Sequence, residues 1–460
     1  MKNFIKFSKT DIKIINSYFL LAVILIILIS IGYSSYALFS FTKTSSNVIE
    51  ATVGKIEKKP NAPVLASNMI PVYYDEAAET WKKADLVNPN NTYKWYDYNN
   101  GMWANAVTVT SSSRSKYLNA SIGTAISMND ITTMWVWIPR FNAITPINYN
   151  GGTKTKPNAI NVTYAKQNEP AIDAFTFGNK ELSGFWYGKF ETGHATLASN
   201  TTKNNLGCTN EICNNANGII IKPNVQSLRN NNVSNFFFAS RSMEQTGNSF
   251  GFVSTEVDTH MSKNNEWGAV AYLTQSIYGR CTNGTTCSEV GINNNKNYIT
   301  GYGAPAGSSS SVTNGTYNTT LGKDASTTGT IYGIYDMAGG AIEYVMGVLA
   351  DPNGKPRSGY NSSYNSGFTG MLKDGTTYTG ITFPDSKYYN LYTGSSYTGH
   401  ALTETKNWYS DDAIFVSASD PWFRRGGSFY VGTDAGVFGF SICDGYSHAN
   451  RSSRLVISNK

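Results

Sequence analysis

The strongest hydrophobic pattern in the chain lies near its start, within residues 1–41. Tyr18–Ile31 reads YFLLAVILIILISI without a charge, and with Gly32–Phe41 it reaches the roughly 20 residues that span a bilayer. The lysine-rich flank Met1–Lys13 precedes this run, so the positive-inside tendency predicts that the flank stays cytoplasmic and that the chain from about Thr42 is translocated. Small residues around Tyr36 fit a cleaved signal peptide equally well. Both alternatives predict an exported chain, held at the cell surface by a single-pass anchor or secreted.

Beyond residue 41 the pattern changes to short apolar stretches separated by Asn/Gly turns. Residues 42–66 combine a strand-like stretch with the linker composition EKKPNAPVLA. Residues 67–131 read as short strands and predict a small β-rich N-terminal unit or an extension of the next domain. Ser127–Phe141 predicts a turn that leads into a buried strand, and one large domain is expected over residues 132–460.

Composition narrows the fold and function classes. Charged residues make up 15% and aromatic residues 13% of the chain, which favours a loop-rich, strand-rich fold rather than a helical bundle. The formal net charge is +6, and half of it comes from Lys2, Lys6, Lys9 and Lys13 set against Asp11. The remainder is too weakly basic for a nucleic-acid footprint, so no nucleic-acid partner is expected.

Four of the five cysteines form two close pairs. Cys208 precedes Cys213 in GCTNEIC, and Cys281 precedes Cys287 in RCTNGTTC. In an oxidising compartment these spacings predict two short-loop disulfides rather than a zinc site, because close ligand spacings and paired histidines are missing. Cys443 remains without a predicted partner.

A series of motifs follows in a fixed order along the later part of the chain. Over about Thr132–Lys460 they resemble the formylglycine-generating enzyme family, also called sulfatase-modifying-factor domains. The resemblance implies an α+β fold, loop-rich with short strands and few helices, namely the C-type-lectin-like fold in its larger form. The matching segments are MWVWIP at 134–139, FWYGKFET at 185–192, HMSKNNEWGAVAYL at 260–273, YGIYDMAGGAIEYVMG at 332–347, RRGGSF at 424–429 and SRLV at 453–456.

Several residues in these motifs are expected to be scaffold. Glu266–Leu273 has the apolar spacing of a helix with a small-residue face, and it contains Trp267. Gly426 and Gly427, after Arg425, allow a turn that a β-carbon would disfavour. Asp336 and Glu343 are expected to accept hydrogen bonds from buried backbone or from Arg425. We interpret them as structural anchors rather than a catalytic pair, since nothing nearby in the sequence supplies a nucleophile.

The catalytic chemistry of the resembled family depends on a cysteine pair just after the RGGSF-like segment. Val431 and Gly436 stand at those positions here. Copper-thiolate chemistry requires sulfur, so the sequence predicts no such oxidase activity and no catalytic residues. The four histidines, including His448, are scattered without ligand spacing, so no metal site or cofactor is expected, and a structural calcium ion is left open.

The segment from Tyr430 to Arg454, within a variable region at 429–454, mixes small, polar and aromatic types without helical or strand periodicity. Such a mixture suits a recognition surface better than a core. It resembles the variable C-terminal regions of diversity-generating retroelement proteins, in which asparagine-type codons are rewritten. The alternative is an ordinary loop-and-strand ending of the fold. The candidate ligand-binding residues are Tyr430, Thr433, Asp434, Phe438, Ser441, Cys443, Asp444, Tyr446, His448, Asn450 and Arg451.

These patterns predict a membrane-anchored, surface-displayed receptor or adhesin that binds a protein or glycan outside the cell. A structural fibre or pilus-like subunit is the alternative, because Tyr36–Ile56 resembles the leader and first strand of secreted biofilm-fibre subunits of the camelysin type. An enzyme of the formylglycine-generating type is disfavoured by the missing cysteines.

Overall fold

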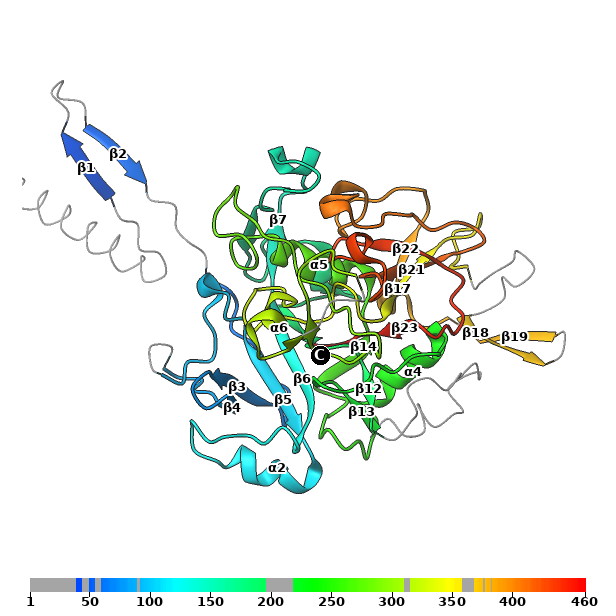
Figure 1. Ribbon diagram of the computed structural model, residues 1–460, viewed down its shortest axis with the longest axis horizontal. Helices are drawn as coiled ribbons and strands as arrows, with labels where there is room; N and C mark the ends of the chain where they lie inside the picture. The colour runs from blue at the N-terminus through cyan, green and yellow to red at the C-terminus, as the bar shows by residue number, and fades with distance from the viewer. Residues whose placement is uncertain are drawn as a thin grey trace, which may run out of the picture. The chain divides into compact units, whose positions relative to one another are not determined.

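The computed structural model describes residues 39–43, 49–53, 59–88, 92–195, 218–309, 315–357, 368–374, 377–381 and 383–460 (Figure 1). The chain divides into two compact units, Met1–Lys59 and Pro60–Lys460. In the first unit, strands β1 (Phe39–Lys43) and β2 (Ile49–Val53) form an antiparallel hairpin. The apolar run 18–31 and the Cys208–Cys213 pair lie outside the described residues. Among the residues that are described, no helix has the length and apolar character needed to cross a membrane.

The second unit is built around a seven-stranded sheet in which every pairing is antiparallel. In spatial order its strands are β14 (Val257–Met261), β24 (Leu455–Asn459), β11 (Gly184–Gly188), β6 (Ile131–Pro139), β5 (Asn105–Val109), β3 (Ile70–Asp75) and β4 (Thr80–Lys83). The buried strand predicted from MWVWIP is β6, and its apolar run is nearly continuous because a central strand is covered on both faces.

The expected boundary between residues 131 and 132 does not separate two compact units. Strand β5 pairs with β6 over its whole length, with Asn105 opposite Val136, and β3 and β4 extend the same sheet (Figure 1). Separating residues 67–131 would leave the buried edge of β6 with unpaired backbone groups. The whole stretch from Pro60 to Lys460 therefore shares one core.

A second sheet of five strands carries the C-terminal region. It contains β20 (Asn390–Tyr392), β17 (Ile342–Leu349), β21 (Trp422–Arg425), β22 (Phe440–Cys443) and β23 (Arg451–Ser453). Strand β17 pairs antiparallel with β21 and parallel with β20 and β23. Because β23 is followed almost directly by β24, the last residues of the chain pass from this sheet into the first one, where β24 lies between β14 and β11.

Four α-helices occur among the described residues, namely α2 (Ser111–Leu118), α4 (Val233–Ser242), α5 (Asn264–Thr274) and α6 (Thr320–Asp324). Helix α5 covers the predicted helical segment and is buried along its length. Glu266 stabilises its first turn by accepting a hydrogen bond from the backbone N–H of Lys263 (2.8 Å). Gly268 is required for packing, since a β-carbon there would lie 2.5 Å from the carbonyl carbon of His400.

The remaining elements are short, as expected for a loop-rich α+β fold. Two-stranded pairs are β7 (Phe141–Ala143) with β8 (Val162–Tyr164), β9 (Thr176–Phe177) with β10 (Lys180–Glu181), β12 (Gly193–His194) with β13 (Ile219–Ile220), β15 (Tyr302–Gly303) with β16 (Gly315–Thr316), and β18 (Phe368–Asp374) with β19 (Thr377–Ile381). The 3-10 helices are η1 (Tyr98–Asn100), η2 (Asn148–Gly151), η3 (Asp173–Phe175), η7 (Ser386–Tyr388), η8 (Thr403–Thr405), η9 (Trp408–Ser410) and η10 (Gly432–Asp434).

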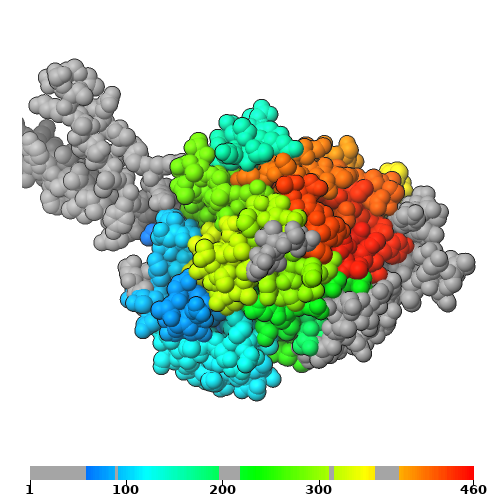
Figure 2. Space-filling model, viewed as in Figure 1, coloured from blue at the N-terminus to red at the C-terminus, as the bar shows by residue number. Residues whose placement is uncertain are grey.

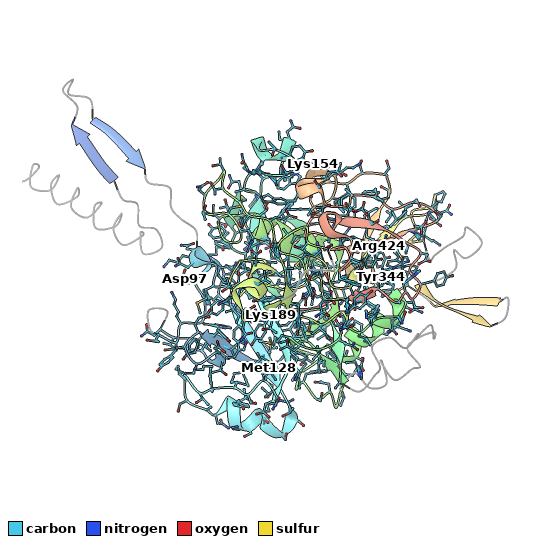
Figure 3. All side chains as sticks on the ribbon, in the orientation of Figure 1. Asp97, Met128, Lys154, Lys189, Tyr344 and Arg424 are labelled. Carbon is cyan, nitrogen blue, oxygen red and sulfur yellow. A yellow bond between two sulfur atoms is a disulfide. The ribbon has the colours of Figure 1, made fainter. Side chains whose placement is uncertain are left out.

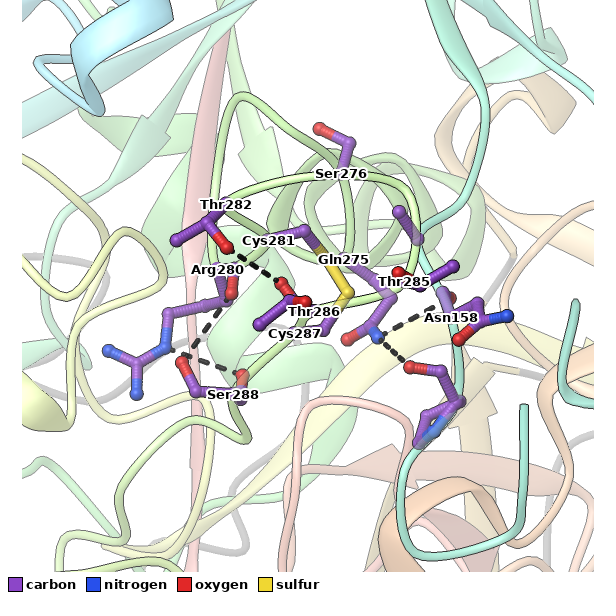
Figure 4. Close-up of a disulfide and its surroundings, with 12 residues drawn as sticks. Asn158, Gln275, Ser276, Arg280, Cys281, Thr282, Thr285, Thr286, Cys287 and Ser288 are labelled. Carbon is purple, nitrogen blue, oxygen red and sulfur yellow. Dashed lines mark hydrogen bonds between the residues drawn. A yellow bond between two sulfur atoms is a disulfide. The ribbon is translucent and has the colours of Figure 1, made fainter.

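A disulfide joins Cys281 and Cys287 in the loop that follows α5 (Figure 4). Inside the loop, the backbone N–H of Thr282 donates to the carbonyl of Thr286 (2.9 Å). At the end of α5, the side-chain amide of Gln275 donates to the carbonyl of Pro157 (3.1 Å). The bridged loop is therefore attached to both the buried helix and the segment that precedes β8.

Candidate ligand-binding face

One face of the second sheet collects polar side chains from three adjacent strands. Arg424 on β21 lies opposite Tyr344 on β17 and opposite Ser441 on β22. Because side chains alternate along a strand, Ile342 and Cys443 point to this same face. Figure 3 shows Tyr344 and Arg424 in this C-terminal part of the fold. The surface above these two residues is called the C-terminal face below.

Strand periodicity does occur in the segment where the sequence predicted none. Phe440–Cys443 and Arg451–Ser453 are strands β22 and β23, so pairing fixes the orientations of Ser441 and Cys443. The strands are only four and three residues long, which is too short for alternation to be visible against the mixed composition around them.

A tight turn connects β21 to the loop above this face. Gly426 and Gly427 have φ angles of +83° and +74°, a conformation that residues with a β-carbon rarely adopt. A β-carbon at Gly427 would also lie 2.6 Å from Cα of Ala435. The turn predicted for the two glycines is therefore present. The backbone conformation of both residues and the close packing at Gly427 require glycine there.

A small cavity of about 90 Å³ opens beside this turn. The Arg424 guanidinium forms one long hydrogen bond, from Nη2 to the hydroxyl of Ser441 (3.4 Å), and its buried Nε has no partner. No carboxylate lies within 4.0 Å of it in the part of the chain that the structure describes. The lining residues are Ile342, Asp412, Arg424, Gly427, Val431, Asp434, Gly439, Phe440 and Ser441.

Seven of the predicted binding residues reach the surface of this C-terminal region. Tyr430 is 51% exposed, and Asn450 from the opposite loop donates a hydrogen bond to its hydroxyl (3.0 Å). The C-terminal residues form one continuous orange and red area in Figure 2. Thr433 and Asp434 are also exposed, and Asp444, Tyr446, His448 and Asn450 are half-buried.

The other four predicted binding residues are buried, which corrects their expected exposure. Phe438 packs in the core against Trp408, with ring centroids 5.0 Å apart. Cys443 is 1% exposed, and Ser441 and Arg451 are also buried. Apolar contact explains the burial of Phe438, while the pairing of β22 and β23 in the second sheet explains the burial of the other three side chains.

The buried residues of this region form a connected polar cluster. The Tyr344 hydroxyl donates to the carbonyl of Tyr446 (2.6 Å) and lies 2.7 Å from Cys443 Sγ. The Arg451 guanidinium contacts the same sulfur, donates to the Tyr344 hydroxyl (2.8 Å), and lies 3.2 Å from Asp444 Oδ1. Burial raises the pKa of Cys443 to about 12, although Arg451 acts in the opposite direction. The thiol is therefore protonated at neutral pH.

Cys443, Asp444 and His448 have one ligand atom each within 4.8 Å of the others, a spacing that a metal ion could bridge. The sequence did not predict this group. Burial disfavours ionised Asp444, but hydrogen bonds from His448, Cys443 and the backbone of Tyr446 outweigh it and hold the pKa of this carboxyl well below its usual value. Arg451 already contacts the sulfur and the carboxylate, so a metal ion would have to displace a cationic side chain.

Trp267 and Arg425, two of the predicted scaffold residues, stabilise the region of the glycine turn through buried hydrogen bonds. Trp267 on α5 donates from its indole N–H to the carbonyl of Val437 (2.8 Å). The Arg425 guanidinium lies 5.6 Å from the centre of the Trp267 ring and donates to the carbonyl of Ala401 (3.0 Å). The two positions that carry cysteines in the resembled family differ in their surroundings. Val431 packs against Ala435, whereas a β-carbon at Gly436 would lie 2.1 Å from the carboxylate oxygens of Asp411.

Neither predicted carboxylate anchor forms an ion pair with the Arg425 guanidinium within the described residues, although Glu343 lies opposite Arg425 in the β17–β21 pairing. Glu343 accepts hydrogen bonds from Arg454, whose Nε lies 3.0 Å from Oε2. Asp336 accepts from the backbone N–H of Gly301 (2.9 Å) and from the side chain of Asn293 (2.8 Å). Burial raises the pKa of Asp336 to about 6. Glu343 and Asp336 therefore hold buried backbone and neighbouring strands in place, and their role is structural.

The sequence missed three residues of this face: Tyr344, Arg424 and Asp412. Tyr344 and Arg424 lie inside quoted motifs, and their strand alternation was the signal that could have placed them on the same face. The sequence around Asp412 contains no pattern that would have placed this residue on the C-terminal face. Its N–H donates to the carbonyl of Asp434 (3.0 Å), and this long-range contact brings it to the cavity.

No protein-family model matches the chain, and no curated protein matches it either. The geometry of the C-terminal face is therefore the basis on which a function can be proposed.

Proposed function

We propose that this chain is a surface-displayed ligand-binding protein, a receptor or adhesin anchored by its N-terminal segment, whose C-terminal face binds a protein or glycan. One observation carries the proposal. The cavity contains an arginine without an acidic partner among the described residues, and the tyrosine, threonine, aspartate, histidine and asparagine side chains of the same C-terminal region reach solvent. Such residues combine rigid aromatic contact with adaptable hydrogen bonding.

We further propose that the domain has a C-type-lectin-like fold of the formylglycine-generating-enzyme type. The segments that carry the resemblance coincide with elements that frame both sheets, namely β6, β11, α5, β17 and β24. The RRGGSF segment coincides with the end of β21 and the glycine turn. This agreement supports the assignment, which a structural superposition on members of that family would test.

Diversification by a retroelement is proposed for the positions at the surface of this face. Exposed side chains such as Tyr430 and Thr433 can change with little effect on the core, since surface substitutions usually alter stability by about 0.5 kcal/mol or less. A near-copy of the DNA encoding residues 430–454 beside a reverse-transcriptase gene would support this proposal. A genome with neither feature would contradict it.

The binding proposal can be tested with the full-length chain in detergent micelles, probed against arrays of glycans and of extracellular proteins. A Tyr430→Ala/Tyr446→Ala double variant should bind the identified partner at least tenfold more weakly, because aromatic anchors at such faces contribute roughly 2 kcal/mol or more. Tyr397→Ala is the matched control, since Tyr397 is 39% exposed and lies outside the face. Equal binding by all three proteins would overturn the proposal.

Export and the fibre alternative need separate tests. Protease added to intact cells, with any outer membrane permeabilised, should digest the chain beyond Thr42, and complete protection would contradict the proposed topology. A fibre subunit would instead polymerise through its N-terminal strands. Purified chain that forms filaments, and loses them when residues 39–53 are replaced by a Gly/Ser sequence, would favour that alternative over the receptor.

A further inference from the structure

The cavity on the C-terminal face contains charges of both signs that do not neutralise each other. The Arg424 guanidinium forms no ion pair among the described residues. Asp412 and Asp434 line the same cavity, and neither carboxylate takes part in an ion pair within the described ranges. The cavity therefore offers a cation and two anions that remain available to a ligand.

The position of Arg424 explains why it stays unpaired. It lies in the middle of β21, between Tyr344 and Ser441, which are uncharged. Asp412 comes from a loop and Asp434 ends η10, and a hydrogen bond from Asp412 N–H to the Asp434 carbonyl (3.0 Å) joins the two segments. Strand pairing fixes the position of Arg424, and the contact between their two segments fixes Asp412 and Asp434. The positive and negative side chains therefore remain separate.

A guanidinium presents a planar set of N–H donors that matches a carboxylate. Aspartate side chains accept hydrogen bonds from an ammonium group. A ligand with only a carboxylate would meet two like charges in this cavity, and a ligand with only an amine would meet Arg424. A compact group that carries both charges satisfies each side.

We propose that this cavity binds the zwitterionic head of an α-amino acid, with the carboxylate on Arg424 and the ammonium on Asp412 and Asp434. The inference rests on the proposed ligand-binding function and specifies its chemistry. Two sources present this group: a free amino acid, and the unblocked amino-acid end of a cell-wall diaminopimelate side chain. Both have an ammonium and a carboxylate on one carbon.

Three small probes separate the charges: alanine has both, N-acetylalanine has only the carboxylate, and alaninamide has only the ammonium. Calorimetry on the full-length chain in detergent should detect binding of alanine and at least tenfold weaker binding of the other two. A diaminopimelate arm, with the free compound and with peptidoglycan fragments, distinguishes the two sources. Equal binding of alanine and N-acetylalanine, or no binding of any zwitterion, would overturn the inference.

Variants then assign the contacts. Arg424→Gln should weaken alanine binding at least tenfold without lowering the melting temperature, and Arg424→Lys should weaken it less. Asp412→Asn should also weaken it. Arg357→Gln is the matched control, because Arg357 is similarly half-buried and its side chain donates to one backbone carbonyl (3.0 Å). If Arg424→Gln does not fold, the alanine affinities of Asp412→Asn and Arg424→Lys test the assignment instead. Unchanged affinity in all folded variants would contradict the assignment.

The rim variants distinguish this inference from the proposed function. If partner binding depends on Tyr430 and Tyr446 but alanine does not bind, the zwitterion inference fails and the receptor proposal stands. If alanine binds through Arg424 and the rim variants leave partner binding unchanged, the proposed face fails and the amino-acid site stands.

Discussion

The Nε–H of Arg454 donates a bifurcated hydrogen bond to the two carboxylate oxygens of Glu343, at 3.1 Å and 3.0 Å, and both side chains are fully buried. Glu343 belongs to β17 in the second sheet, and Arg454 is the residue between β23 and β24. A further hydrogen bond from Arg454 reaches the carbonyl of Gly188 at the end of β11 (2.9 Å). One ion pair therefore joins the two sheets.

Replacing Glu343 by alanine should destabilise the domain by about 3–5 kcal/mol, because Arg454 would remain buried without its counter-charge. The measurement is the urea midpoint of the full-length chain. Lys82→Ala is the control, since it breaks a partly exposed pair with Asp75 and should lower the midpoint much less. A Glu343→Ala midpoint close to that of the control would contradict the role of this pair.

His260 should make stability depend on pH. Burial alone would lower its pKa, but the carboxylates of Glu266 and Asp258 outweigh burial and raise it above the ordinary value of 6.5. The stabilisation is therefore complete below about pH 6.5 and is lost as pH rises through the folded-state pKa. Arg241, Lys387 and Tyr388 also contact Asp258.

Thermal unfolding between pH 5.5 and 8.5 should show the wild-type melting temperature falling with pH more steeply than that of His260→Gln. Parallel curves for the two proteins would show that this histidine does not carry the pH dependence.

Substitutions within the predicted binding segment should divide according to burial. Tyr430→Ala should change the free energy of unfolding by about 0.5 kcal/mol or less, because the side chain is half exposed. Phe438→Ala should cost about 3–5 kcal/mol, because its ring packs against Trp408 and Tyr409. Denaturant titrations compare the two variants, and equal losses would show that burial does not separate these positions.

The chain should lack formylglycine-generating activity. Incubated with copper and a cysteine-containing sulfatase peptide, it should leave the peptide thiol unchanged, as judged by mass spectrometry. Adding cysteines by Val431→Cys/Gly436→Cys should not create activity, because a side chain at position 436 meets the Asp411 carboxylate. The double variant should melt at a lower temperature than Val431→Cys alone. Turnover by the wild-type chain would contradict the prediction.

Reducing the Cys281–Cys287 bridge should have a modest effect. The bridge closes a short loop, with a sequence separation of 6, so the chain-entropy relation gives about 2 kcal/mol. The Cys281→Ser/Cys287→Ser variant should therefore stay folded with a lower melting temperature. Peptide mapping without reductant tests this pair and the Cys208–Cys213 pair together, and free thiols at all four positions would contradict the prediction.

The features that could be predicted from sequence are those set by neighbouring residues. Helix α5 follows from the spacing of Trp267, Val270 and Leu273, and β6 from an uninterrupted apolar run. The glycine turn follows from a conformation that few other residues adopt. Each signal lies within a dozen residues, so no knowledge of distant partners was needed.

The candidate face depends on distant pairing and could be predicted only in part. Whether Ser441 and Cys443 lie on the same side as Arg424 is decided by the register of β22 on β21. Arg451 is buried because β23 pairs with β17, more than a hundred residues away along the chain. A polar composition identified the region, but only the sheet determines which of its side chains reach solvent.

Strand β24 lies between β11 and β14 in the larger sheet, and it is encoded immediately after the segment that forms the candidate face. A frameshift or premature stop anywhere in the codons for residues 430–454 therefore removes the strand that connects β11 to β14. Such a chain loses a central strand and the Glu343–Arg454 pair together. Only messages read in frame through the whole face can yield a folded domain, so the fold itself filters errors introduced where sequence change is most tolerated.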